Sequence, residues 1–83
     1  MKLPRDLSGA KLVKALERMD YRITRQTGSH IRLTCDNPSQ HHITIPNHDP
    51  LKVGTLAGIL GDVALHHHMT RDELSQRLFG KNS

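Results

Sequence analysis

Two different spacings of hydrophobic residues occur along this chain, and they separate helical from extended segments. Apolar residues recur at helical spacing from Gly9 to about Met19, directly after Ser8, a typical helix N-cap. A second helical stripe begins near residues 51–54 and runs to about Leu65. A third helix is predicted over Arg71–Phe79, because the Thr70-Arg71-Asp72-Glu73 capping box precedes it.

Three shorter stretches alternate between apolar and polar residues, which is the pattern of half-buried strands. They cover residues 21–27, 30–35 and 41–45, and turn-forming residues 36–40 separate the last two. The order of the elements predicts an α+β fold with a three-stranded antiparallel sheet that has one apolar face.

The first hairpin admits two registers, which differ in the side chains that share a face. A two-residue turn, Gly28-Ser29, would place Ile23 opposite Thr34, and a half-buried sheet disfavours that pairing. A three-residue loop over 27–29 places Ile23 opposite Leu33 instead. We therefore predict the three-residue loop.

That register has consequences for the polar face. It puts His30 opposite Gln26 and beside Arg32 and Thr24. In the second hairpin the same reasoning pairs apolar residues with each other, Leu33 with Ile43 and Ile31 with Ile45.

The composition limits what the fold can do. With 83 residues the chain is expected to be one domain spanning residues 1–83, with little core to enclose a pocket. A formal charge of +4 and a sequence pI of about 9.7 favour a polyanionic partner such as nucleic acid. The single cysteine, Cys35, rules out an internal disulfide, and no membrane-spanning run is present, so we expect a cytoplasmic protein.

Aromatic residues are nearly absent, since Tyr21 and Phe79 are the only ones. Proteins that read single-stranded RNA by stacking need several exposed rings on one sheet face. If this chain binds RNA, we expect phosphate and 2′-hydroxyl contacts instead.

Histidine transfers protons near neutral pH, and two histidines lie in motifs at strand ends. Gly28-Ser29-His30 opens the second strand, and Ile45-Pro46-Asn47-His48 follows the third. With Gly54-Thr55-Leu56 in the second helix, these motifs resemble the HicA toxin family over roughly residues 6–78. The resemblance implies a double-stranded-RNA-binding-like fold and an mRNA-cleaving ribonuclease, neutralised by a HicB-like antitoxin.

Carried over to this sequence, the resemblance makes His30 the catalytic histidine, with Gly28 and Ser29 as the turn before it. We expect metal-independent transesterification without a cofactor, in which His30 is general base or acid and Arg25 or Arg32 stabilises phosphate charge. His48 is either a second proton-transfer group or a structural residue that fixes its loop.

Further cations and histidines complete the candidate set. Lys52, near the start of the second helix, is predicted to contact the RNA backbone together with Lys11 and Lys14. Residues 66–68, His-His-His, are interpreted as loop rather than metal ligands, because adjacent residues rarely converge on one ion. His41-His42 is interpreted as one inward and one outward strand residue.

Two other functions compete with the ribonuclease. The first is a noncatalytic RNA-binding module on the same scaffold, and the second is a small adaptor that binds a protein through its polar sheet face. Formation of 2′,3′-cyclic phosphate ends in the presence of EDTA would distinguish the enzyme from the binding module.

Overall fold

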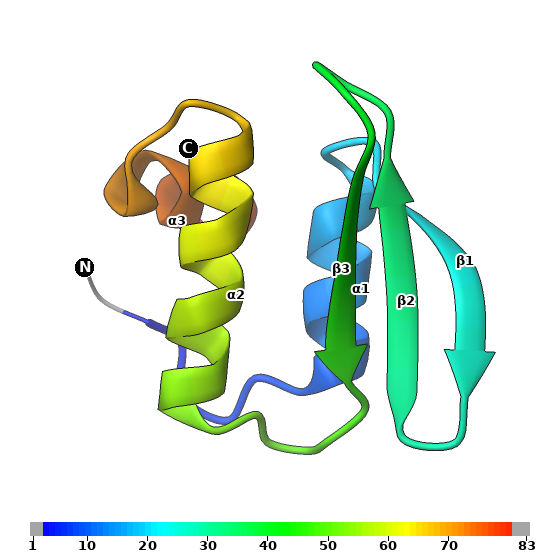
Figure 1. The fold of residues 1–83 in the computed structure, drawn as a ribbon. Coiled ribbons are helices and arrows are strands. Elements are labelled where there is room, and N and C mark those ends of the chain that lie inside the picture. Colours follow the sequence, from blue (N-terminus) through cyan, green and yellow to red (C-terminus); the bar gives the residue numbers. More distant parts are fainter. Residues whose placement is uncertain (1–2, 81–83) are drawn as a thin grey trace.

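The predicted order of elements is confirmed in the computed structural model, which describes residues 3–80. A helix leads into a three-stranded antiparallel sheet of order β1-β2-β3, and two helices follow (Figure 1). The elements are α1 (Gly9–Glu17), β1 (Arg22–Thr27), β2 (His30–Cys35), β3 (His41–Pro46), α2 (Val53–His66) and α3 (Arg71–Phe79).

Helix α1 lies behind the sheet, while α2 runs alongside β3 (Figure 1). The apolar side chains of β2 and β3 join the helices in one core, whose fully buried members include Leu12, Leu16, Leu33, Ile45, Leu56, Leu60 and Leu74. No helix of residues 3–80 is long and apolar enough to cross a membrane.

Local capping signals in the sequence are confirmed at two helix ends. The Ser8 side chain accepts a hydrogen bond from the Lys11 amide at 3.1 Å. At α3, Thr70 and Glu73 form the reciprocal capping box, with bonds of 3.0 and 2.8 Å. These bonds satisfy amides that the first helical turn leaves without a partner.

The predicted turn of the first hairpin is wrong, although its apolar pairing is right. Thr27 lies opposite His30, so the turn is the two-residue Gly28-Ser29, with Gly28 at φ +42°. A β-bulge at Thr24 then inserts one extra residue and restores Ile23 opposite Leu33. The bulge reconciles a tight turn with the placement of Ile23 and Leu33 on one face, although Ile23 itself stays exposed at the edge of the sheet.

The bulge also changes the neighbours of His30. Gln26 pairs with Ile31 rather than with His30, and it therefore leaves the polar face. In the second hairpin the predicted pairs, Leu33 with Ile43 and Ile31 with Ile45, are confirmed.

The interpretation of residues 66–68 as a loop is wrong in part. His66 is the last residue of α2, and His67 is its C-cap. Both are half-buried, whereas His68 is exposed with φ +56°.

Candidate functional site

His30 lies at the rim of the sheet as the first residue of β2, and its side chain is exposed. It pairs with Thr27 on one side and Pro46 on the other. Ser29 Oγ lies 3.3 Å from His30 Nδ1. The second ring nitrogen, Nε2, has no partner among residues 3–80, so it is available to a ligand.

The two histidine motifs meet in the folded chain. Ser29 accepts a hydrogen bond from the Asn47 amide at 2.7 Å, which fixes the loop after β3 against the turn before His30. The Gly9 amide donates to the His48 carbonyl at 2.8 Å. His48 thus anchors its loop through its backbone, while its side chain is exposed. This arrangement favours the structural interpretation of His48.

Two arginines lie next to His30 on the polar face. Arg25 of β1 is directly opposite Arg32 of β2, and both are exposed. Within residues 3–80, neither guanidinium has an acidic partner, whereas Arg22 is paired with Asp36 at 2.7 Å. Like charges directly opposite one another destabilise a sheet, so this pair is suited to an anion.

A chain of hydroxyl groups orients a second histidine, His42, for which no functional role was predicted from the sequence. Thr34 is only 2% exposed, and its Oγ1 lies 2.8 Å from His42 Nδ1 and 2.9 Å from Thr24 Oγ1. Thr24 Oγ1 in turn donates to the Arg32 carbonyl at 3.4 Å. The alternation of polar residues was visible in the sequence, but the bulge that brings Thr24 to Thr34 was not.

The family model described as HicA toxin of bacterial toxin-antitoxin matches residues 9–65, more than half of the chain. The chain belongs to the HicA toxin family. The match runs from the first residue of α1 into the last turn of α2, so it includes both histidine motifs. No curated protein and no solved structure matches the chain.

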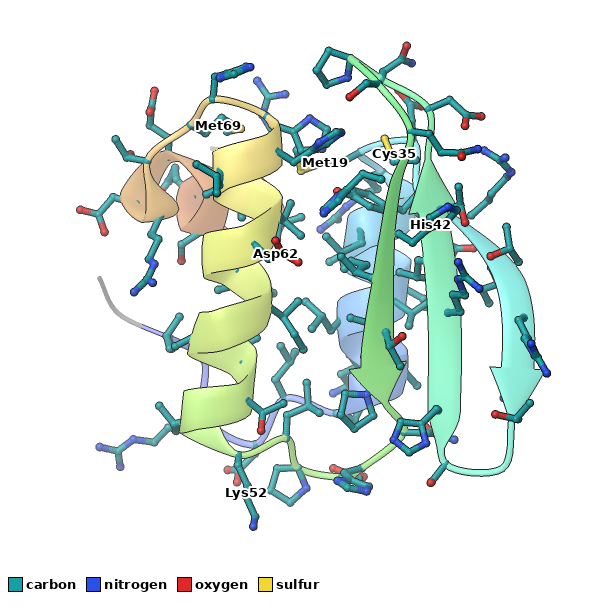
Figure 2. The ribbon with its side chains drawn as sticks, in the orientation of Figure 1. Met19, Cys35, His42, Lys52, Asp62 and Met69 are labelled. Atoms are coloured by element: carbon teal, nitrogen blue, oxygen red, sulfur yellow. The ribbon has the colours of Figure 1, made fainter. Side chains whose placement is uncertain are left out.

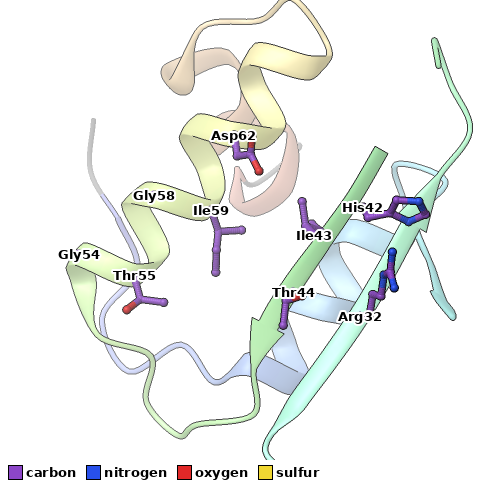
Figure 3. Close-up of a pocket in the computed structure, with 9 residues that line it drawn as sticks. All are labelled: Arg32, His42, Ile43, Thr44, Gly54, Thr55, Gly58, Ile59 and Asp62. Atoms are coloured by element: carbon purple, nitrogen blue, oxygen red, sulfur yellow. The ribbon is translucent and has the colours of Figure 1, made fainter. Parts of the chain in front are cut away.

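In this HicA toxin a groove separates β3 from α2 (Figure 3). It has a volume of about 560 Å³, and its walls are Arg32, His42, Ile43 and Thr44 from the sheet and Gly54, Thr55, Gly58, Ile59 and Asp62 from α2. A Cβ atom added at Gly54 or Gly58 would meet nothing within 4 Å. The two glycines therefore leave open space at their own positions in the helical wall. His30 is not part of this groove.

The three candidate lysines of the HicA toxin are not brought together. Lys11 and Lys14 are on α1, behind the sheet, whereas Arg25 and Arg32 are on its polar face. Lys52 is the N-cap residue of α2, at the end of the molecule where β2 begins (Figure 2). Lys52 is thus at the same end as His30, and Lys11 is near that end too but on the helix behind the sheet.

A cluster of rings lies at the other end of the HicA toxin. Tyr21 Oη lies 2.8 Å from His41 Nδ1 and 3.2 Å from His67 Nε2. His41 stacks on His66, with ring centroids 4.1 Å apart. His66 Nε2 is buried and has no hydrogen-bond partner in the described residues. The histidines at 66 and 67 are therefore packed side chains, not loop filler.

This environment shifts the pKa values of Tyr21, His41 and His67. Burial, followed by the charge of neighbouring His66, lowers the pKa of His41, although Asp62 at 3.7 Å opposes the shift. Burial and then His66 also lower the pKa of His67. Burial raises the pKa of Tyr21. Each shift favours the neutral form.

Residues 3–80 contain no group of three or more histidine, cysteine or acidic side chains arranged to hold a metal ion.

Proposed function

We propose that this toxin is an endoribonuclease that cleaves mRNA, with His30 as its general acid or base. The observation that carries the proposal is the position of His30, an exposed imidazole in the same strand as Arg32 and on the same face. Residues two apart along a strand are separated by about 7 Å, so a phosphate beside His30 is within reach of the long Arg32 side chain.

RNA supplies its own nucleophile, the 2′-hydroxyl next to each phosphate. A base at His30 takes the 2′-hydroxyl proton, and the 2′-oxygen attacks phosphorus. The bond from phosphorus to the 5′-oxygen breaks, and that oxygen takes up a proton from water. The products carry a 2′,3′-cyclic phosphate and a 5′-hydroxyl. A positioned acid or base contributes about 10² to 10⁴-fold to such a step.

Charge develops on the phosphate oxygens as the 2′-oxygen attacks. Arg32 and Arg25 carry fixed positive charges next to His30 and have no acidic partner in the described residues. Guanidinium groups bind phosphate oxygens through paired hydrogen bonds, and fixed charges stabilise a transition state without reorganising.

The partner we propose is a HicB-like antitoxin protein that covers His30 and the arginine pair. Covering both would remove the acid or base and the phosphate contacts together. We also propose that the toxin acts in the cytoplasm, where mRNA is found.

The test is incubation of the purified chain with RNA in EDTA, with analysis of the new ends. We expect 2′,3′-cyclic phosphate ends from the wild type and none from His30→Ala. His68→Asn is the matched control, because His68 is also exposed and asparagine tolerates its positive φ. Retained cleavage by His30→Ala would overturn the assignment.

A noncatalytic RNA-binding module is the second candidate, favoured by one observation. Arg32 lines the groove between β3 and α2 that does not include His30, so a binding surface exists apart from the proposed catalytic group. RNA binding with no new ends in any condition would support this alternative.

A further inference from the structure

The groove between β3 and α2 is distinct from the position of His30, although both border the polar face of the sheet. We infer that this groove, together with Arg32 and His42, is a second RNA subsite that holds a nucleotide away from the cleaved bond. His42 would contact its phosphate, Arg32 would lie between this phosphate and the one beside His30, and the groove would receive its base. The inference rests on the proposed function for its substrate, but its test does not depend on cleavage.

The first argument is the separation of the two histidines. His42 lies opposite Thr34, which is four residues along β2 from His30. Four residues span about 13 Å in a strand, and side chains on one face project side by side. A proton-transfer group must lie within about 3.2 Å of its target. His30 and His42 therefore cannot both act on one phosphodiester, and His42 serves another part of the RNA.

The second argument is that His42 is held in place although it is exposed. One proton arrangement satisfies every member of its hydroxyl chain. His42 Nδ1–H donates to Thr34, Thr34 donates to Thr24, and Thr24 donates to the Arg32 carbonyl. Uptake of a proton at Nε2 leaves all three bonds intact. In its protonated form the ring has Nε2–H as its remaining donor, and that donor suits a phosphate oxygen.

The third argument is the unneutralised charge at the mouth of the groove. Arg32 lines the groove, and Arg25 lies opposite it on the neighbouring strand. The surface that includes Thr24, Thr34 and His42 contains both arginines. This pairing costs stability in the free protein, and a bound phosphate would remove that cost.

The fourth argument is the shape and chemistry of the groove itself. Gly58 lies inside α2, where glycine costs about 1 kcal/mol relative to alanine, yet it has open space in front of it. Ile43 and Ile59 supply apolar walls, and Asp62 supplies a carboxylate. A carboxylate repels phosphate and accepts N–H groups of a base, so the Asp62 side suits a base and the Arg32 side a phosphate.

The experiment measures RNA binding in the His30→Ala chain, so that cleavage does not interfere. Fluorescence anisotropy is recorded with a labelled RNA of eight nucleotides and with a labelled dinucleotide. We expect His42→Ala to weaken binding of the longer RNA about tenfold, as for loss of a hydrogen bond to a charged group. Gly58→Gln, which fills the groove, should have a similar effect. Binding of the dinucleotide, which cannot reach both sites, should change little.

Matched variants separate a subsite from a structural effect. Gly58→Ala adds one methyl group to open space and should retain RNA binding. Thr34→Ser keeps the hydroxyl that contacts His42 and should also retain RNA binding, whereas Thr34→Val removes the hydroxyl and should weaken it. Thermal unfolding of each variant reports any loss of fold.

The outcomes distinguish the two proposals. Binding of the longer RNA that depends on His42 and Gly58, in a wild-type chain that cleaves nothing, would support the subsite and refute the ribonuclease. Affinity that is unchanged in folded His42→Ala and Gly58→Gln variants would overturn the subsite. Loss of antitoxin binding alone in those variants would also overturn it, because the groove would then be a protein-binding surface.

Discussion

Arg25 and Arg32 lie directly opposite each other on neighbouring strands, and neither has an acidic partner among residues 3–80. Both are exposed, and the two positive charges share one face of the sheet. Opposed like charges oppose folding and favour anion binding, so the same pair should affect stability and RNA affinity in opposite directions.

The variant Arg25→Gln tests this relationship. We expect the free energy of unfolding to rise by about 0.2–1 kcal/mol, since the cross-strand repulsion is removed. RNA affinity should fall, and the slope of log affinity against log salt concentration should decrease by the amount expected for about one phosphate contact. Urea unfolding and anisotropy at several salt concentrations measure the two effects. A less stable variant with unchanged RNA affinity would contradict this account.

Gly9 should not tolerate a side chain. A Cβ atom there would overlap the carbonyl oxygen of Pro46, and the Gly9 amide holds the His48 carbonyl. We expect Gly9→Ala to lower the free energy of unfolding by about 1–3 kcal/mol, as for other overpacked sites. Gly58→Ala is the control and should raise stability by up to about 1 kcal/mol. Urea unfolding of both variants tests these expectations. If Gly9→Ala were as stable as Gly58→Ala, α1 would be able to move away from β3 and make room for the methyl group.

Stability should decrease in acid because of His41 and His67, which pack in the cluster of rings around Tyr21. The pKa values of His41 and His67 are lowered in the folded state, so the unfolded chain binds more protons below the ordinary histidine value of about 6.5. Their contribution is therefore fully present above that value and is lost as pH falls towards the folded pKa values.

Urea unfolding at about pH 7.5 and about pH 5.5 measures this loss. His41→Gln should reduce the difference between the two conditions, because it removes one of the shifted groups. His68→Asn should leave the difference nearly unchanged, since His68 is exposed. A wild-type chain that is equally stable at both pH values would show that the cluster does not resist protonation.

Lys52 should contribute to RNA binding through charge alone. It is the exposed N-cap residue of α2, at the end of the molecule where β2 begins. We expect Lys52→Gln to weaken binding similarly for all RNA sequences. The slope of log affinity against log salt concentration should decrease by the amount expected for about one phosphate contact. Lys14→Gln is the comparison, because Lys14 is on α1 behind the sheet. Equal effects from both lysines would indicate that the RNA reaches around the sheet.

The sequence by itself determined the elements of this fold. Helix caps at Ser8 and Thr70 and the alternating pattern of β2 are local signals, because each depends on residues within one turn or one strand. The apolar pairing of Ile23 with Leu33 also followed from the sequence, since burial of one face restricts the register. The motifs that contain His30 and His48 were also visible in the sequence, since each is a run of adjacent residues.

Only the tertiary structure decided which polar groups meet. The bulge at Thr24 leaves the apolar pattern intact, so the pattern could not reveal it, yet it brings Thr24 to Thr34 and Arg25 opposite Arg32. Tyr21 and His67 are far apart in sequence, and their contact depends on how α2 packs beside the sheet. Burial determines the pattern along the chain, but contacts between distant segments depend on the geometry of the whole fold.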